Sequence, residues 1–413
     1  MPQFLNRRNF GQPQMLAALL LLVFVAESVW LTSRAVKASS LDSGEIARVH
    51  EGLRQWHGYG VAGAPRAVVE GGDPNDPQAI GTGVAAEFDH DHSPLWYLVA
   101  SAPSLVWPQS FAPEAALYWA WLARIPFLVF GVLLGASLWY VARRLYGDAG
   151  GYIALGLYCF SPEILRSTSL WVAPPEMGAA WGAFGAIFTA VAVSHTLYAP
   201  REVVLWNWRR IVLLGLSFAL AIGSQFSLIV VVPLALAFML YLAPTRRKAA
   251  LGIWGAACVL ALVILYASYF AHPAAFWNSV KQASFLTRTW QAFAMGRVYL
   301  QLLWQFLQSS PALAVLFPAA LVAYVSWRRI RYFGNTAPLL VALLFIVCSL
   351  LSPHYPGFGF QLMALPFLFV FVAGVSADLL ETRYRDLVLA VVGGTLVASA
   401  LWNVLQLVKA GNS

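Results

Sequence analysis

Charged side chains are scarce in this sequence. Asp, Glu, Lys and Arg together make up 11% of its 413 residues, whereas a soluble domain carries about a quarter. Hydrophobic residues make up 60%, and the mean hydropathy is +0.68. So little charge argues against a soluble enzyme, because the folded chain would lack the polar surface that keeps such a protein dissolved. The composition instead predicts an all-α fold, a polytopic bundle of membrane-spanning helices.

Cysteine is also rare, and internal repeats and low-complexity segments are missing. The three cysteines, Cys159, Cys258 and Cys348, all lie inside apolar runs. This placement is typical of small buried residues and indicates neither a disulfide framework nor a metal site. The net charge of +8 does not predict nucleic-acid binding, because the basic residues are spread between the apolar runs and form no single patch.

Apolar runs long enough to cross a bilayer recur along the whole chain. A helix needs about 20 mostly apolar residues to span the hydrocarbon. By this measure we predict about eleven spans in one membrane domain, residues 1–413, with the third and fifth spans the shortest. The spans lie near 14–33, 116–142, 149–161, 176–198, 210–225, 226–243, 249–270, 310–327, 336–352, 361–377 and 387–407.

The basic residues predict the orientation of these spans. With the N-terminus in the cytoplasm, 15 of the 26 basic residues fall in short inner loops, as the positive-inside rule requires. The chain is therefore expected to be a multi-pass protein of the plasma (inner) membrane. The inner residues are Arg7, Arg8, Arg143, Arg144, Arg201, Arg209, Arg210, Arg246, Arg247, Lys248, Arg328, Arg329, Arg331, Arg383 and Arg385.

Two long loops are then predicted on the outer, periplasmic side, at 34–114 and 272–309. The first holds ten of the 18 acidic residues. Amphipathic spacing in 42–57 and an aromatic, apolar stretch in 94–107 predict helices that lie on the membrane surface. The second loop mixes aromatic with basic residues and is interpreted in the same way.

Several short motifs follow one another in the order that one known family shows. Together they resemble the polyprenyl-phosphate-sugar-dependent glycosyltransferases of the GT-C fold, such as protein O-mannosyltransferases and the lipid A aminoarabinose transferase. That family usually opens with adjacent Asp and Glu, whereas the second position here is Ser43. The motifs are Asp42-Ser-Gly-Glu45, Phe88-Asp-His-Asp-His92-Ser-Pro94-Leu-Trp-Tyr97, Leu122-Ala-Arg124-Ile-Pro126, Arg143-Arg-Leu-Tyr-Gly147, Ala173-Pro-Pro-Glu176-Met and His354-Tyr355.

The resemblance implies a sugar transfer, with inversion, from a polyprenyl-phosphate donor to an acceptor on the outer face of the membrane. Such a reaction needs a base for the acceptor hydroxyl and cations or hydrogen-bond donors for the departing phosphate. The expected catalytic residues are Asp42 as general base, with Glu45 and Glu176. Asp91 is expected to support the site, and the residues expected to bind the donor phosphate are His92, Arg288, Arg297, His354 and Tyr355.

The expected partners are the lipid-linked sugar donor and membrane lipids, with no nucleic acid. The sequence does not identify the acceptor, which is a lipid, a glycan or a protein. No cofactor is predicted, and a divalent metal ion stays open.

Each candidate residue also has a simpler structural interpretation. Asp42 and Glu45 match the spacing of a helix N-terminal cap, and Glu176 follows two prolines at a helix start, where a carboxylate is favoured anyway. His92 and His354 are alternatively ordinary loop histidines. The basic residues of the second loop, Lys281, Arg288 and Arg297, are alternatively anchors at the lipid headgroups.

Two charged residues are predicted near the outer ends of spans. Arg124 lies 19 residues before Arg143, about 28 Å along a helix, and Glu27 lies at a comparable depth near the outer face. Charges there are costly unless they are paired or wetted. The sequence predicts either a structural Glu27–Arg124 pair or an Arg124 that supports the site from below.

Two other functions compete with the transferase. A lipid or sugar flippase or transporter would place its site near the midplane, often on broken helices in repeated halves. The sequence shows no repeat, and only Glu27 lies clearly inside a span away from the cytoplasmic rim. A non-catalytic envelope-assembly subunit is the other alternative, and Ser43 in place of the second acid keeps it open.

Overall fold

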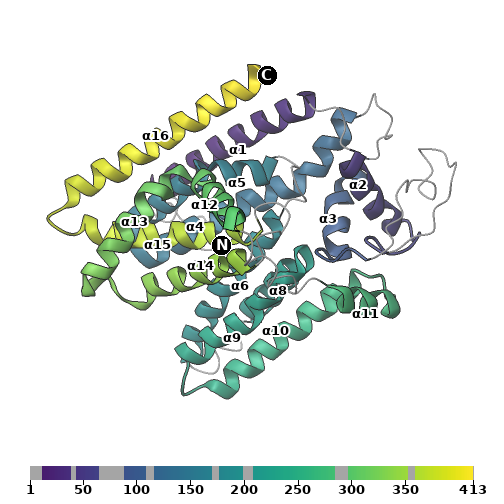
Figure 1. Cartoon of the computed structure of the whole chain (residues 1–413). Coiled ribbons are helices and arrows are strands. Elements are labelled where there is room, and N and C mark those ends of the chain that lie inside the picture. Colours follow the sequence, from purple (N-terminus) through teal and green to yellow (C-terminus); the bar gives the residue numbers. More distant parts are fainter. Residues whose placement is uncertain are drawn as a thin grey trace. The chain divides into compact units, whose positions relative to one another are not determined.

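The computed structural model describes residues 12–38, 43–64, 88–107, 116–169, 176–198, 208–283, 296–351 and 359–412 (Figure 1). Within these ranges the chain is helical and has no strand, which confirms the all-α prediction. Its helices are α1 (Gln12–Ala38), α2 (Ser43–Trp56), α3 (Pro94–Val106), α4 (Ala116–Cys159), α5 (Pro162–Ser169), α6 (Met177–Thr196), α8 (Trp208–Ser224), η3 (Phe226–Val230), α9 (Val231–Leu242), α10 (Arg247–Ala267), α11 (Pro273–Gln282), α12 (Gly296–Ser309), α13 (Pro311–Ser326), η5 (Arg328–Ile330), α14 (Phe333–Leu351), α15 (Gly359–Leu380) and α16 (Arg385–Asn412).

Each of the eleven apolar segments falls on a helix, but the helices differ in length. Among the described residues, seven helices are long and apolar enough to cross a membrane, or eight if the bent pair Tyr299–Ser309 and Pro311–Ser326 counts as one span. The 17 residues of α8 and the 12 of α9 are shorter than the usual span. A total of eleven spans therefore stays a prediction.

The second and third predicted spans form a helical hairpin within α4. A straight helix of 44 residues would be about 66 Å long, roughly twice the hydrocarbon thickness. The helix breaks at Gly147, whose φ of 74° is accessible to glycine at little cost. Beyond the break the chain runs back along itself, because Tyr158 donates a hydrogen bond to the Gly131 carbonyl (2.5 Å).

The described residues form two compact units, and each unit draws on several stretches of sequence. The first consists of Met1–Arg34, Phe130–Pro175 and Arg288–Ser413. Its centre is α15, in which 89% of the apolar segment Leu362–Leu380 is buried. Helices α13, α14 and α16 pack against α15.

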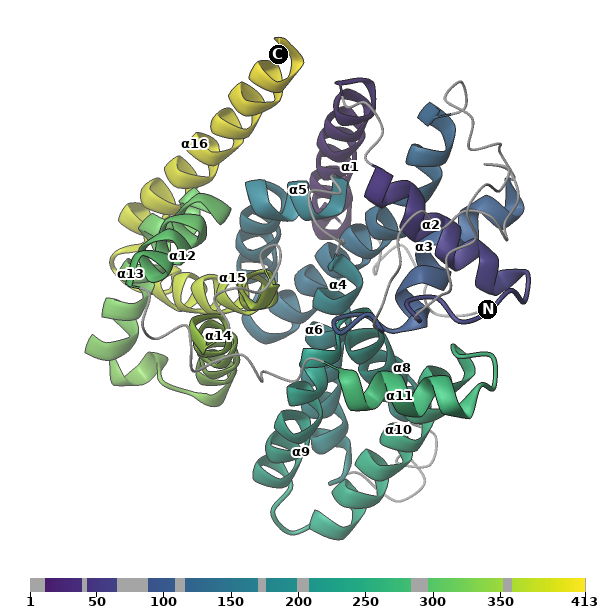
Figure 2. The ribbon, with the colours of Figure 1, turned by 45° about the vertical axis from the view of Figure 1, so that its right-hand side comes forward.

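The second unit consists of Ala35–Val129 and Glu176–Thr287. Within it α10 packs against α8 and α9, and α6 also packs against both of these helices (Figure 2). The α6–α8 contact is close because a Cβ atom on Gly182 would lie 2.5 Å from the backbone nitrogen of Ala221. A side chain at position 182 would therefore force the two helices apart.

The predicted helices of the first outer loop are present as α2 and α3, and they pack on each other. Gly52 of α2 has no room for a side chain, since an added Cβ would lie 2.3 Å from the Tyr97 carbonyl oxygen. The second loop likewise contains the helices α11 and α12. The placement of both loops on the outer side stays a prediction.

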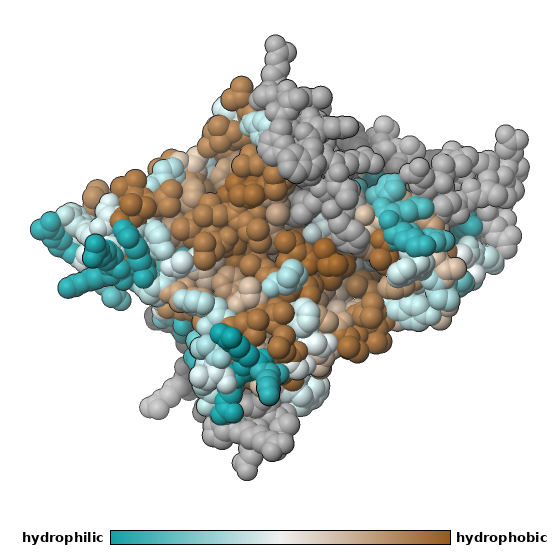
Figure 3. Space-filling view, turned by 60° about the horizontal axis from the view of Figure 1, so that its bottom comes forward, coloured by the Kyte–Doolittle hydropathy of each residue, from teal (hydrophilic) through white to brown (hydrophobic). Residues whose placement is uncertain are grey.

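Much of the surface is apolar, as expected for helices in contact with lipid. Figure 3 shows hydrophobic side chains over a large part of one face, with hydrophilic side chains gathered in separate clusters. Helices α10 and α16 bury only 22% and 17% of their apolar segments, and they expose large side chains such as Leu262 and Leu401. The chain is therefore a polytopic helical membrane protein.

Candidate active site

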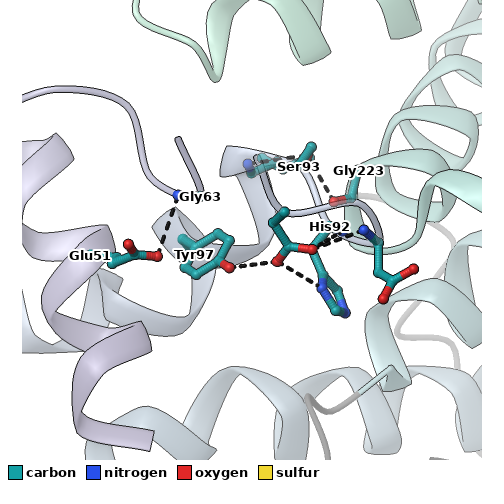
Figure 4. Close-up of polar contacts among 9 residues, drawn as sticks. Glu51, Gly63, His92, Ser93, Tyr97 and Gly223 are labelled. Atoms are coloured by element: carbon teal, nitrogen blue, oxygen red, sulfur yellow. Dashed lines mark hydrogen bonds and ion pairs between the residues drawn. The ribbon is translucent and has the colours of Figure 1, made fainter. Parts of the chain in front are cut away.

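Asp89 is the centre of a hydrogen-bonded loop directly before α3 in the second unit. Its Oδ1 accepts the backbone N–H groups of Asp91 (2.8 Å) and His92 (3.1 Å). Its Oδ2 accepts the Nδ1–H of His92 (3.1 Å) and the hydroxyl proton of Tyr97 (2.5 Å) (Figure 4). Both side-chain partners lie within eight residues of Asp89, so the local sequence determines most of this geometry.

The surroundings of Asp89 and His92 favour an ionised pair although both side chains are largely buried. Burial alone would raise the pKa of Asp89, but the charge of His92 and the hydrogen bonds from His92, Tyr97 and the Asp91 backbone hold that pKa well below its usual value. Burial alone would lower the pKa of His92, but Asp89 raises it overall, and Glu176 and Asp91 add to the rise. The shift of each pKa therefore favours an aspartate beside an imidazolium.

The His92 ring has one nitrogen bonded to the protein and one without a partner among the described residues. Nδ1 is bonded to Asp89, which fixes the ring, while Nε2 is buried and has no hydrogen-bond partner among the described residues. The Trp96 ring lies 5.3 Å from the His92 ring, between centroids, and 5.8 Å from Phe127. This aromatic wall limits the movement of His92 and keeps water away from one side of it.

The loop is tied to the corner that follows α8. Ser93 caps α3 by accepting the Leu95 N–H (3.2 Å), and its hydroxyl donates to the Gly223 carbonyl (2.8 Å). The Phe226 N–H donates to the Asp91 carbonyl (2.9 Å). Residues 91–93 are thus fixed against residues 223–226, which are 130 positions away in sequence.

A glycine turn supports the other side of the loop. The Asp89 N–H donates to the Gly63 carbonyl (2.7 Å), and the Gly63 N–H donates to Glu51 Oε2 (3.3 Å). Gly63 has a φ of 71°, and an added Cβ would lie 3.2 Å from Asp89 Cβ, so glycine suits both the backbone and the close approach. Helix α2 therefore positions Asp89 through this turn.

Glu176 stands at the start of α6 and belongs to the same site. It is buried, its Oε2 has no hydrogen-bond partner among the described residues, and its side chain makes no capping bond. Burial raises the pKa of Glu176 to about 8, the charge of His92 opposes the rise, and Asp91 adds to it. At neutral pH Glu176 is mostly a neutral acid, which can donate a hydrogen bond.

The structure therefore brings His92, Asp91 and Glu176 together. Several predicted site residues fall outside what it describes: Asp42, Arg288, His354 and Tyr355 lie outside the described residues, and the side chains of Glu45 and Arg297 are also outside them. Their roles stay predictions. The expected meeting of His92 with His354 and an arginine of the second loop is likewise untested.

The two charged residues predicted near the outer ends of spans, Arg124 and Glu27, lie in different units. Arg124 is buried in α4, where it donates to the Ala120 carbonyl (2.9 Å). Glu27 is buried in α1, and its Oε2 has no hydrogen-bond partner among the described residues. The predicted Glu27–Arg124 pair would join the two units, and it stays a prediction.

Asp89 is central to this hydrogen-bonded loop, but the sequence analysis gives the roles in its motif to Asp91 and His92. The spacing of Asp89 and His92, with Tyr97 shortly after, is the signal that could have found it, because an acid three residues before a histidine in a turn can accept the Nδ1–H. Among the described residues, no group of three or more His, Cys, Asp and Glu side chains is placed to hold a metal ion.

Comparison with solved structures shows that the chain shares its fold with an archaeal oligosaccharyltransferase. The structures it matches are those of the archaeal oligosaccharyltransferase AglB from Archaeoglobus fulgidus. The form in complex with an inhibitory peptide and a dolichol-phosphate is 12% identical, with a TM-score of 0.59 over 96% of this chain. The apo form is 13% identical, with a TM-score of 0.58 over 95% of this chain.

The likeness is one of fold and not of sequence. The chain spans about half the length of these oligosaccharyltransferase structures, 56% and 55% respectively. No protein-family model and no curated protein sequence matches the chain.

Proposed function

We propose that the chain is a membrane glycosyltransferase that moves a sugar from a polyprenyl-phosphate donor to an acceptor on the outer face of the membrane, with inversion. The GT-C fold supports this class of enzyme. One solved neighbour is a complex with an inhibitory peptide and a dolichol-phosphate, which supports a lipid-phosphate donor. The motifs of the first outer loop favour the same chemistry.

The observation that carries this proposal is the buried His92 ring, which Asp89 holds at Nδ1 (3.1 Å) and which keeps Nε2 without a partner among the described residues. When the ring is protonated, Nε2–H is the donor available to a substrate oxygen. A polyprenyl phosphate gains negative charge as it leaves the sugar, and a fixed cationic donor stabilises that developing charge. Asp89 raises the pKa of His92, which favours the charged form of this donor.

The reaction needs a base as well as this donor. The acceptor hydroxyl attacks the anomeric carbon, the bond from that carbon to the phosphate oxygen breaks, and the bonding electrons leave with the phosphate. Asp42 takes the acceptor proton, with general-base assistance worth about 10²–10⁴-fold. Glu176 is unsuited to this task at pH 7 because its pKa is about 8, so we assign it to binding as a neutral acid.

The test is sugar transfer by the purified chain in lipid nanodiscs. A radiolabelled polyprenyl-phosphate hexose is supplied with envelope acceptors, and released polyprenyl phosphate is measured by thin-layer chromatography. His92→Asn should lower the rate about 10- to 150-fold, since a hydrogen bond to a charged group contributes about 1.5–3 kcal/mol. His272→Asn is the matched control, because His272 is exposed and bonds its own turn at the Tyr269 carbonyl (2.9 Å).

A transporter would give a different result. Liposomes that carry the protein would then exchange the labelled lipid between leaflets without releasing polyprenyl phosphate. That outcome, with His92→Asn leaving the exchange rate unchanged, would refute the transferase.

A further inference from the structure

The second unit contains several side chains with a buried polar atom that has no hydrogen-bond partner among the described residues, and four of them concern the site. The atoms of these four are Nε2 of His92, Oε2 of Glu176, both amide atoms of Gln225 and the hydroxyl of Ser227. Gln225 is 0% exposed and Ser227 4% exposed. Neither of these two residues has a role in the site as described so far.

The packing of α6 on α8 brings Gln225 and Ser227 level with Glu176. The helices are antiparallel, because Gly182 approaches Ala221 while Gly185 approaches Ser217. From Gly182 back to Glu176 is about 9 Å along a helix, and from Ala221 forward to Gln225 is about 6 Å in the same direction. Both side chains therefore lie at the end of the helix pair where α6 begins.

The same end meets the loop of His92. The Phe226 N–H, between Gln225 and Ser227, donates to the Asp91 carbonyl (2.9 Å). The charge of His92 and that of Asp91 both act on Glu176. Three separate stretches of sequence, each with a buried polar atom that lacks a partner among the described residues, thus meet at this end of the helix pair.

Local structure does not use these atoms. The Gln225 backbone is fully engaged, since its N–H bonds the Ala221 carbonyl (3.0 Å) and its carbonyl accepts from Leu228 (3.1 Å). Its amide group adds nothing to that corner. Leaving buried polar groups unpaired costs stability, so native structures rarely keep several together without a ligand or water to pair them.

The chemistry of the cluster fits a neutral ligand with hydroxyl groups. An amide and a hydroxyl each donate and accept, as sugar hydroxyls do. Gln225 and Ser227 carry no charge, so these two side chains add no attraction for an anion beyond that of His92. Unpaired polar atoms of this kind discriminate strongly between ligands that do and do not carry the matching hydroxyl.

We propose that Gln225 and Ser227, beside Glu176, bind the hydroxyl groups of a sugar ring and determine which sugar the protein accepts. This inference rests on the proposed glycosyltransferase function and names the substrate group that the cluster recognises. The ring belongs either to the lipid-linked donor or to a glycan acceptor. The same chemistry serves both, and the experiment separates them.

The test uses Gln225→Leu and Ser227→Ala in the full chain in nanodiscs. The matched control is Ser194→Ala, because Ser194 is also buried but its hydroxyl bonds the Ala190 carbonyl in its own helix (2.8 Å). The probes are polyprenyl phosphate alone, polyprenyl-phosphate hexose and a soluble methyl hexoside. Equilibrium binding is measured for the lipids, and saturation-transfer NMR for the glycoside.

A donor-sugar site predicts that each variant raises the Kd of the lipid-linked hexose about tenfold, the effect of one lost hydrogen bond of typical strength, and leaves the Kd of bare polyprenyl phosphate unchanged. An acceptor-sugar site predicts weaker methyl hexoside binding only. Equal changes for bare and sugar-bearing lipid, or no change for any probe, would overturn the proposal. Failure of the wild-type chain to bind any polyprenyl phosphate would instead count against the proposed function.

Thermal stability separates recognition from a structural role. If the Gln225 side chain binds the ligand, the Tm of Gln225→Leu measured without ligand should equal or exceed that of the wild type, because the variant removes an unpaired buried amide. A marked fall in Tm with unchanged sugar binding would show a structural residue and refute the assignment.

Discussion

Replacing Asp89 with asparagine should remove the charge from His92 while it preserves the shape of the loop. Asparagine can still accept the backbone N–H groups of Asp91 and His92 at 2.8 and 3.1 Å. It cannot hold the positive charge of the imidazolium. With the main raising influence gone, burial lowers the pKa of His92, so that the ring becomes neutral at pH 7.

The magnitude follows from the hydrogen bond that is weakened. A bond from a charged donor contributes about 1.5–3 kcal/mol, against about 0.5–1.5 kcal/mol for a neutral one. The difference of about 1–1.5 kcal/mol should lower the transfer rate at pH 7 about 5- to 13-fold. Imidazolium is favoured below its pKa, so the variant should regain activity as the pH is lowered towards 5, whereas the wild-type rate should not rise over that range.

The assay is the release of polyprenyl phosphate by the purified variant between pH 5 and pH 8. Tyr97→Phe is the control, because it removes a hydrogen bond to Asp89 (2.5 Å) but keeps the carboxylate charge. That variant should show a smaller loss and no shift of the pH profile. Wild-type activity of Asp89→Asn across the whole range would refute the ion-pair reasoning.

Three further predictions concern the base, Glu176 and the topology. Asp42→Asn and Asp42→Ala should both abolish transfer if Asp42 is the base. If Asp42 is only a helix cap, Asp42→Asn should leave the rate in a transfer assay unchanged, and Asp42→Ala should lower the free energy of unfolding by about 1 kcal/mol. As the pH rises from 5 to 9 in a thermal-shift assay, the Tm of Glu176→Gln should fall less than that of the wild type. The pKa of Glu176 is raised to about 8, so the folded wild type resists an ionisation that the unfolded state accepts, and it loses stability as the pH rises. Parallel Tm curves for the two proteins would contradict this prediction. A cysteine at Gly72 should react with an impermeant thiol reagent in intact cells, and protection there would reverse the predicted orientation.

The sequence by itself determined the fold class and the positions of the helices. Charge was too scarce for a soluble protein, and each apolar run was long enough to form a helix, because helix formation depends on neighbours within a few turns. The amphipathic flanks of the first loop became α2 and α3 for the same reason. The contact of Asp89 with His92 is local too, because the two residues are three positions apart in the sequence.

The tertiary structure decided what lies beside that loop and which groups carry charge. Gln225 and Ser227 are two polar residues at the end of an apolar run, and only the packing of α6 on α8 places them level with Glu176. The sequence shows that Glu176 is a carboxylic acid, but burial makes it neutral at pH 7. Neither result depends on residues close by in sequence, because burial and long-range packing arise only when distant helices meet.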